Sequence, residues 1–187
     1  MKRLVTATIM AWLALASQVF AQVPVAALYR VKSSEVPLGD GDKPGDVRRI
    51  IQPFGNWTKI CDENLRKKKQ VCNISQIITD QSGSAIFSWS LAGTDGGDPV
   101  MILRGSNGSG IMQTAHLDFG SVGKPVDVLL DSCNEKQCLG LMYVSAEMKK
   151  IILKGPLTRI TVQEFGTQPT TFEAPLSDLA KALLSIK

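Results

Sequence analysis

The chain has 187 residues, of which 44% are hydrophobic and 20% charged, and its formal net charge is +4. This composition is ordinary for a globular protein and excludes collagen, coiled-coil and wholly disordered chains. Nucleic-acid binding would require Lys and Arg gathered into a stripe with interleaved aromatic residues, and the sequence has none. We therefore expect a globular domain with no nucleic-acid partner.

The first 21 residues have the layout of a secretory signal peptide. Lys2 and Arg3 form a basic start, an apolar run covers residues 4–15, and Ala21 is a small residue suited to cleavage. No later apolar run approaches the roughly 20 residues of a membrane-spanning helix. The sequence predicts cleavage after Ala21 and a secreted protein, with no transmembrane segment after signal removal.

Residues 22–50 differ in composition from the rest of the chain. They contain Pro24, Pro37 and Pro44 and the polar run 39–45, in which three of the residues are glycine. Such a stretch has little apolar surface to bury, so we predict a flexible N-terminal arm. The folded β-sandwich domain is then predicted to cover residues 51–187.

From Phe54 onward, short runs rich in β-branched and aromatic residues are closed by Gly, Pro, Asn or Asp. No helices are interleaved between these runs, which argues against a βαβ fold. We predict an all-β fold, an antiparallel β-sandwich of about eight or nine strands. The expected strands lie at residues 56–60, 73–78, 85–91, 100–103, 110–119, 126–130, 139–144, 157–165 and 170–172.

The four cysteines of this chain are expected to form disulfides, as in other exported proteins. Cys61 and Cys72 flank a polar loop between two strand-like runs, and Cys133 and Cys138 enclose a four-residue loop. Opposed residues of an antiparallel hairpin lie within disulfide reach. The sequence therefore predicts the pairs Cys61–Cys72 and Cys133–Cys138. A redox role is the alternative, but Cys133 and Cys138 lack the C-x-x-C spacing.

Two segments have helical spacing. Residues 145–155 begin with Ser145 as a cap and end at Gly155, which predicts one short helix before the last strands. Residues 177–186 carry a stripe of leucines behind Ser177, which is the expected cap. They predict a C-terminal helix that lies on the sandwich.

These features together resemble the invasion-associated locus B family of exported Gram-negative proteins. The resemblance rests on residues 54–57 ahead of Cys61, on residues 72–76, and on the second cysteine pair ahead of the helix that ends at Gly155. It covers about residues 54–186. It implies an all-β sandwich in the periplasm or at the outer surface, with a role in envelope interactions and, in some pathogens, in virulence through host-cell invasion. It implies no catalytic residues.

Residues suited to catalysis or metal binding are few. His116 is the single histidine, and Asp118 is expected on the same strand face. A zinc site needs three or four ligands, and no nucleophile elbow surrounds Ser121, which could otherwise complete a triad. We expect an ordinary surface histidine, no metal and no cofactor. Trp57 and Trp89 are either core residues or stacking platforms for a ligand, and their strand positions favour the core.

A run of four basic residues lies in the loop between Cys61 and Cys72. Arg66, Lys67, Lys68 and Lys69 form either a solvated loop or a partner-binding tip. The expected partner is an envelope or host-surface protein or an anionic lipid. The sequence thus predicts a non-enzymatic envelope protein that binds a partner. The alternative is a small secreted hydrolase with dispersed carboxylates, whose separation a sequence does not fix.

Overall fold

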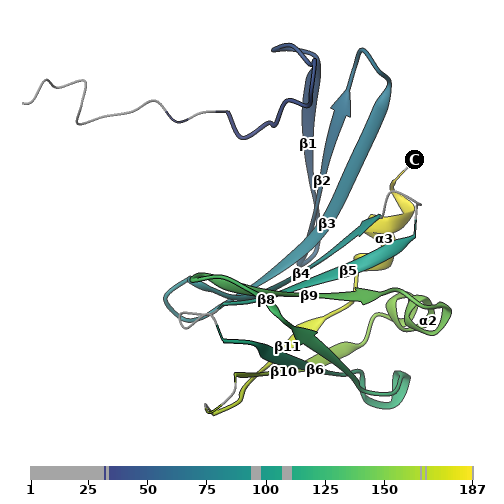
Figure 1. The fold of residues 1–187 in the computed structure, drawn as a ribbon. Coiled ribbons are helices and arrows are strands. Elements are labelled where there is room, and N and C mark those ends of the chain that lie inside the picture. The colour runs from purple at the N-terminus through teal and green to yellow at the C-terminus, as the bar shows by residue number, and fades with distance from the viewer. Residues whose placement is uncertain are drawn as a thin grey trace, which may run out of the picture. The chain divides into compact units, whose positions relative to one another are not determined.

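Two antiparallel sheets form the described part of the chain in the computed structural model (Figure 1). The first sheet contains, in spatial order, β1 (Val47–Phe54), β2 (Trp57–Asn64), β3 (Lys69–Thr79), β4 (Ala85–Gly93), β5 (Pro99–Ser106), β9 (Gln137–Tyr143) and β8 (Ser132–Cys133). The second contains β11 (Thr170–Pro175), β10 (Leu157–Glu164), β6 (Gln113–Asp118) and β7 (Val126–Leu130). This arrangement confirms the predicted all-β sandwich.

The structure describes residues 32, 34–93, 98–106, 111–164, 166 and 168–186, with the backbone alone at Glu164. Residues Val36–Lys187 form one compact unit. The signal peptide predicted for residues 1–21 lies outside the described residues, as do residues 22–31 of the predicted arm.

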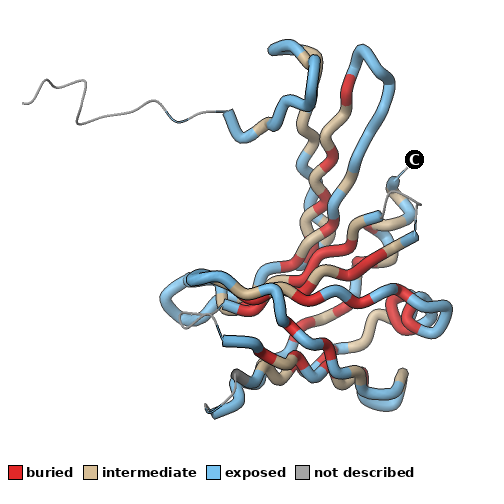
Figure 2. Tube along the Cα trace, viewed as in Figure 1, coloured by how far each residue is buried: buried red, intermediate tan, exposed pale blue. Residues whose placement is uncertain are grey.

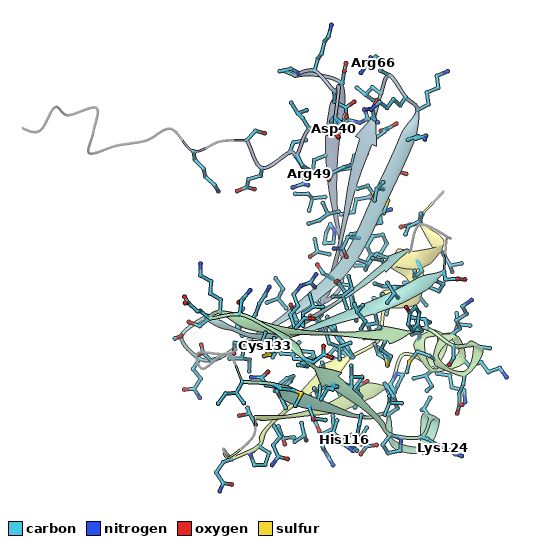
Figure 3. The ribbon with its side chains drawn as sticks, viewed as in Figure 1. Asp40, Arg49, Arg66, His116, Lys124 and Cys133 are labelled. Atoms are coloured by element: carbon cyan, nitrogen blue, oxygen red, sulfur yellow. A yellow bond between two sulfur atoms is a disulfide. The ribbon has the colours of Figure 1, made fainter. Side chains whose placement is uncertain are left out.

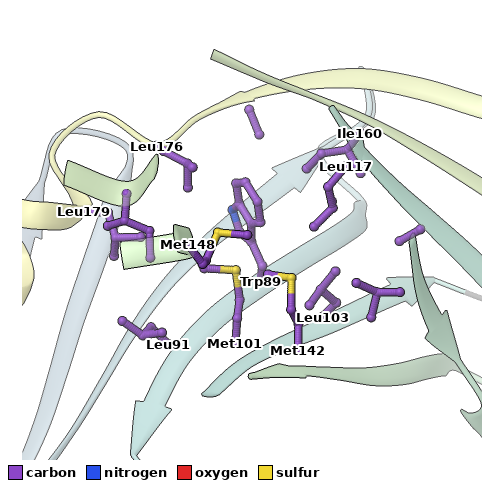
Figure 4. Packing of buried hydrophobic residues seen from close by; sticks show 14 of the residues in the cluster. Trp89, Leu91, Met101, Leu103, Leu117, Met142, Met148, Ile160, Leu176 and Leu179 are labelled. Atoms are coloured by element: carbon purple, nitrogen blue, oxygen red, sulfur yellow. The ribbon is translucent and has the colours of Figure 1, made fainter. Parts of the chain in front are cut away.

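The core lies between the two sheets and is filled by alternate residues of each strand. Figure 2 shows buried positions concentrated where the sheets face each other. Trp57 and Trp89 are both 0% exposed, and their rings stack with centroids 5.5 Å apart. Around Trp89 lie leucine, isoleucine and methionine side chains from both sheets and from a helix (Figure 4). Both tryptophans are therefore core residues and not exposed stacking platforms.

In the described residues, two α-helices and one 3-10 turn accompany the sheets, namely η1 (Gly120–Val122), α2 (Ala146–Lys154) and α3 (Leu179–Leu184). The Ser145 hydroxyl accepts a hydrogen bond from the Met148 amide at 3.1 Å, and Gly155 ends the helix in the left-handed conformation at φ 60°. These are the start and stop signals that the sequence carries for α2. Met148, Ile151 and Ile152 point into the core.

The C-terminal helix begins later than predicted. Asp178, at φ 69°, precedes α3 without a side-chain cap, so the expected cap at Ser177 is wrong. The carboxylate of Asp178 binds Lys181 at 2.6 Å and packs against the turn at Gly55, where an added Cβ would lie 2.6 Å from Oδ2. The residue that precedes α3 therefore lies beside the β1–β2 turn.

The described residues contain eleven strands, more than the eight or nine predicted. The additional strands are β8, which has two residues, and β1, which begins at Val47. The predicted domain boundary at residue 51 therefore falls inside a strand. Arg48 and Arg49 of β1 lie opposite Glu63 and Asp62 of β2 and pair with them, and these two arginines obscure the apolar alternation of β1. Residues 47–50 belong to the sheet and not to a flexible arm.

Candidate functional site

Strands β1, β2 and the first half of β3 extend beyond the second sheet as a three-stranded projection (Figure 1). Cys61 and Cys72 are opposed residues of β2 and β3, with Cα atoms 4.1 Å apart, and they form a disulfide. Cys133 and Cys138 form a second disulfide between β8 and β9. The structure thus contains both predicted pairs. The first one joins the strands that carry the basic loop, so it holds the base of the candidate site.

Two cross-strand ion pairs brace the projection. Arg48 binds Glu63 on one face of the β1–β2 ladder, and Arg49 binds both carboxylate oxygens of Asp62 on the other, at 2.7 and 2.6 Å. The hydrogen bonds from Arg49 lower the pKa of Asp62 below its usual value, against an opposing effect of burial. A bidentate Arg–carboxylate pair is among the stronger charged contacts of proteins.

The tip of the β2–β3 hairpin is held by the segment that precedes β1. Lys67 Nζ lies 2.8 Å from Asp42 Oδ1, and Arg66 Nε lies 3.2 Å from Asp46 Oδ2. Arg66 also donates to the Gly41 carbonyl oxygen at 2.8 Å, and the Leu65 amide donates to the Asp46 carbonyl oxygen at 2.8 Å. Figure 3 shows Arg66 at the far end of the projection, with Asp40 beside it. Residues 40–46, predicted to be part of a flexible arm, are bonded to the tip.

Asp42 is the most enclosed acid of this segment. Its side chain is 7% exposed, whereas that of Lys67 is 45% exposed. The hydrogen bond from Lys67 lowers the pKa of Asp42 below its usual value, although desolvation acts in the opposite direction. The carboxylate is therefore charged at neutral pH and neutralises part of the basic run.

The four basic residues of the tip do not form one uniform patch. Arg66 and Lys67 face the acidic segment, whereas Lys68 and Lys69 are exposed and, among the described residues, make no ion pair. Lys68 has a left-handed backbone at φ 52°, which shapes the turn. The candidate site is consequently a pair of adjacent free lysines on a loop fixed from both sides.

His116 lies on the opposite sheet from the tip. Its Nδ1 is 2.6 Å from Asp127 Oδ1 on the neighbouring strand β7, and both side chains are largely exposed. Asp118 instead accepts a hydrogen bond from the Gly120 amide at 2.9 Å. The histidine thus pairs with Asp127 and not with Asp118. This arrangement does not assemble the Ser121–His116–Asp118 triad considered from the sequence.

Two carboxylates lie along a groove of about 430 Å³ between β7 and β9. Asp127 and Asp131 both line it. Asp127 is paired with His116 of β6, and Asp131 follows the end of β7.

Gln76 links the two sheets in a way that sequence reasoning missed. Its side-chain oxygen accepts from Trp89 Nε1 at 2.8 Å, and its nitrogen donates to the Pro175 carbonyl oxygen at 3.2 Å. Trp57 Nε1 donates to the same carbonyl at 3.2 Å. A polar residue at an inward position of β3 was the signal available in the sequence. Trp57 and Gln76, both part of the family resemblance, thus fix the end of β11 to the larger sheet.

The described part of the chain contains no group of three His, Cys, Asp or Glu side chains placed to hold a metal ion. Within the same residues, no helix is long and apolar enough to cross a membrane.

Two local disulfides and a braced hairpin on a two-sheet antiparallel sandwich define a small β-rich domain, and the disulfides indicate an oxidising compartment. The chain belongs to the Invasion associated locus B (IalB) protein family, whose model matches residues 57–187.

A crystal structure of invasion associated protein B from Bartonella henselae is similar to this chain, with a TM-score of 0.54 and 14% sequence identity. The match covers 72% of this chain and 94% of the Bartonella chain. At this identity the similarity shows a shared fold. No curated protein sequence matches the chain.

Proposed function

We propose that this protein is exported through the signal peptide predicted before Gln22 and binds an anionic partner in the cell envelope without catalysing a reaction. The observation that carries the proposal is the display of Lys68 and Lys69 on a braced tip. The Cys61–Cys72 disulfide joins the two strands at the base of the tip, and the ion pairs to Asp42 and Asp46 hold the tip itself. A loop that is already ordered loses less conformational entropy when it binds.

Membership of the family supports this proposal. The family is envelope-associated and is not a known enzyme family. Its description as invasion associated supports a contribution to host-cell invasion, which we include in the proposal. Among the described residues, the exposed His116–Asp127 pair and the β7–β9 groove that Asp127 lines add no observation in favour of a hydrolase.

Vesicle flotation of the mature chain tests the tip directly. We expect binding to phosphatidylcholine vesicles that contain phosphatidylglycerol, at low salt, and a loss of binding as salt shortens the Debye length to about 10 Å at 0.1 M. Replacing Lys68 and Lys69 by serine should weaken binding about thirtyfold, because each lysine near an anionic surface contributes about 1 kcal/mol.

The matched control is the double substitution of Lys124 and Lys136 by serine. These two exposed lysines lie outside the tip, and their removal changes the net charge equally. If both double variants lose the same amount of binding, the tip has no special role and the proposal fails. Replacing Arg66 and Lys67 would not serve as the main test, because it also breaks the contacts with residues 40–46.

A further inference from the structure

An apolar pocket of about 260 Å³ lies where α2 and α3 meet β4, β5 and the residue after β9. Its walls include Leu91, Val144, Ile152 and Leu183. In Figure 1, α2 lies far from the β2–β3 tip, so this pocket is separate from the site described above. Its lining is almost entirely hydrocarbon. A sugar or peptide would lose hydrogen bonds to water on entering it and would find few replacements, so these ligands do not fit the pocket.

One charged side chain lines this pocket. Lys149 and Leu153 are four residues apart on α2 and therefore share one face of the helix, and both line the pocket. Among the described residues Lys149 makes no ion pair, and Leu153 is 69% exposed although it is apolar. A lysine can keep its ammonium group in water while its methylene chain lies along apolar surface. The pocket thus combines hydrocarbon walls with one cation.

We infer that this pocket binds an amphiphile with a single alkyl chain and an anionic head group. The chain lies against Pro99, Leu153 and Leu183, and the head pairs with Lys149 Nζ. The volume is slightly below the roughly 300 to 1,000 Å³ of typical small-molecule sites, so the pocket takes one short chain or the end of a longer one. This inference goes beyond the proposed function and uses none of the residues of the tip.

Isothermal titration calorimetry of the mature protein with decanoate as the probe tests the inference, because decanoate combines one short alkyl chain with one carboxylate. We expect saturable binding to the wild-type protein. Leu183→Trp fills the pocket and should abolish saturable binding. Leu184→Trp is the matched control, because Leu184 is the next residue, is 82% exposed and does not line the pocket. Urea unfolding of both variants establishes that each is folded.

A second pair of variants tests the head group. Lys149→Glu should weaken binding of the probe about threefold or more, whereas Lys150→Glu makes the same charge change outside the pocket lining and should have a smaller effect. The methyl ester of the probe, which lacks the anion, should bind the wild-type protein more weakly than the acid does. It should also bind Lys149→Glu and the wild type equally.

The inference is overturned if a folded Leu183→Trp protein binds the probe as the wild type does, or if acid and ester bind alike. If the inference holds, vesicle flotation distinguishes two sources of such an amphiphile. If Leu183→Trp lowers binding to phosphatidylglycerol vesicles, the alkyl chain comes from a membrane lipid. If vesicle binding is unchanged while probe binding is lost, the ligand is an amphiphile free in solution.

Discussion

The carboxylate of Asp42, ahead of β1, lies 2.8 Å from Nζ of Lys67 at the tip of the β2–β3 hairpin. This contact joins two segments that the sequence assigns to different parts of the molecule. Because the partly buried acid neutralises one cation and Asp46 neutralises a second, the segment decides which charges of the tip remain available. The conformation of the tip therefore depends on residues 40–46.

Asp42→Asn is expected to loosen the tip without unfolding the domain. The amide cannot form the ion pair with Lys67, and because the Lys67 side chain is 45% exposed, losing this pair should change the free energy of unfolding little. Trypsin should therefore cleave the variant faster within residues 66–69, while its urea midpoint changes little. Asp40→Asn is the control, because no ion pair of the Asp40 side chain is seen among the described residues. Equal cleavage rates in the two variants would contradict the bracing role of Asp42.

The Arg49–Asp62 pair should make the stability of the projection depend on pH in the acid range. The pKa of Asp62 is lowered in the folded chain by the Arg49 hydrogen bonds, so the unfolded chain binds a proton more readily. The stabilisation is therefore fully present above the usual carboxyl pKa of about 3.9 and is lost as pH falls through the lower folded value. We expect the wild type to exceed Asp62→Asn in unfolding free energy at pH 7, and the difference to shrink below about pH 4. A difference that does not change with pH would argue against this ion pair.

Much of the fold could be predicted because its signals are local. The alternation of Phe87 and Trp89 predicts a strand, and Ser145 and Gly155 mark the ends of a helix within one or two residues. The cysteine pairing also follows from local hairpins. In each case the residues that form the sequence pattern are the same residues that form the strand, the helix caps or the disulfide.

The candidate site was less predictable because it depends on contacts between distant segments. The run from Arg66 to Lys69 reads as four equivalent cations, yet Asp42 and Asp46 divide it into two paired and two free residues. β1 was missed for the same reason, since its two adjacent arginines obscure the apolar alternation and their partners Asp62 and Glu63 lie on another strand. Sequence spacing does not show such partners.

Removing the disulfides should affect stability unequally. In the chain-entropy model a disulfide that closes a longer loop stabilises the folded state more. Cys61–Cys72, with a sequence separation of 11, should therefore contribute more to the free energy of unfolding than Cys133–Cys138, with a separation of 5. We expect about 3 kcal/mol for the alanine double variant of the first pair and about 2 kcal/mol for that of the second. Urea unfolding of the two double variants measures both values. A larger loss from the Cys133–Cys138 variant would show that its loop contributes packing beyond the effect on the unfolded chain.

Removing the hydrogen bond between Gln76 and Trp89 should lower the free energy of unfolding markedly, because both side chains are buried. Gln76→Ala leaves the indole N–H of Trp89 without its acceptor, at a cost of about 1 to 3 kcal/mol, and also removes the donor to the Pro175 carbonyl oxygen. Ile77→Ala is the control, since that neighbouring side chain is 61% exposed and should cost less than about 0.5 kcal/mol.

Trp89→Phe separates the hydrogen bond from the packing of the ring. It removes the N–H donor while keeping an aromatic side chain in the core, so Gln76→Ala should cost less in the Trp89→Phe background than in the wild type. A double-mutant cycle measured by urea unfolding gives this coupling, which we expect to lie between about 0.5 and 3 kcal/mol. If the two single losses add without coupling, Gln76 stabilises the sandwich through the Pro175 carbonyl oxygen alone, and its bond to Trp89 makes no net contribution.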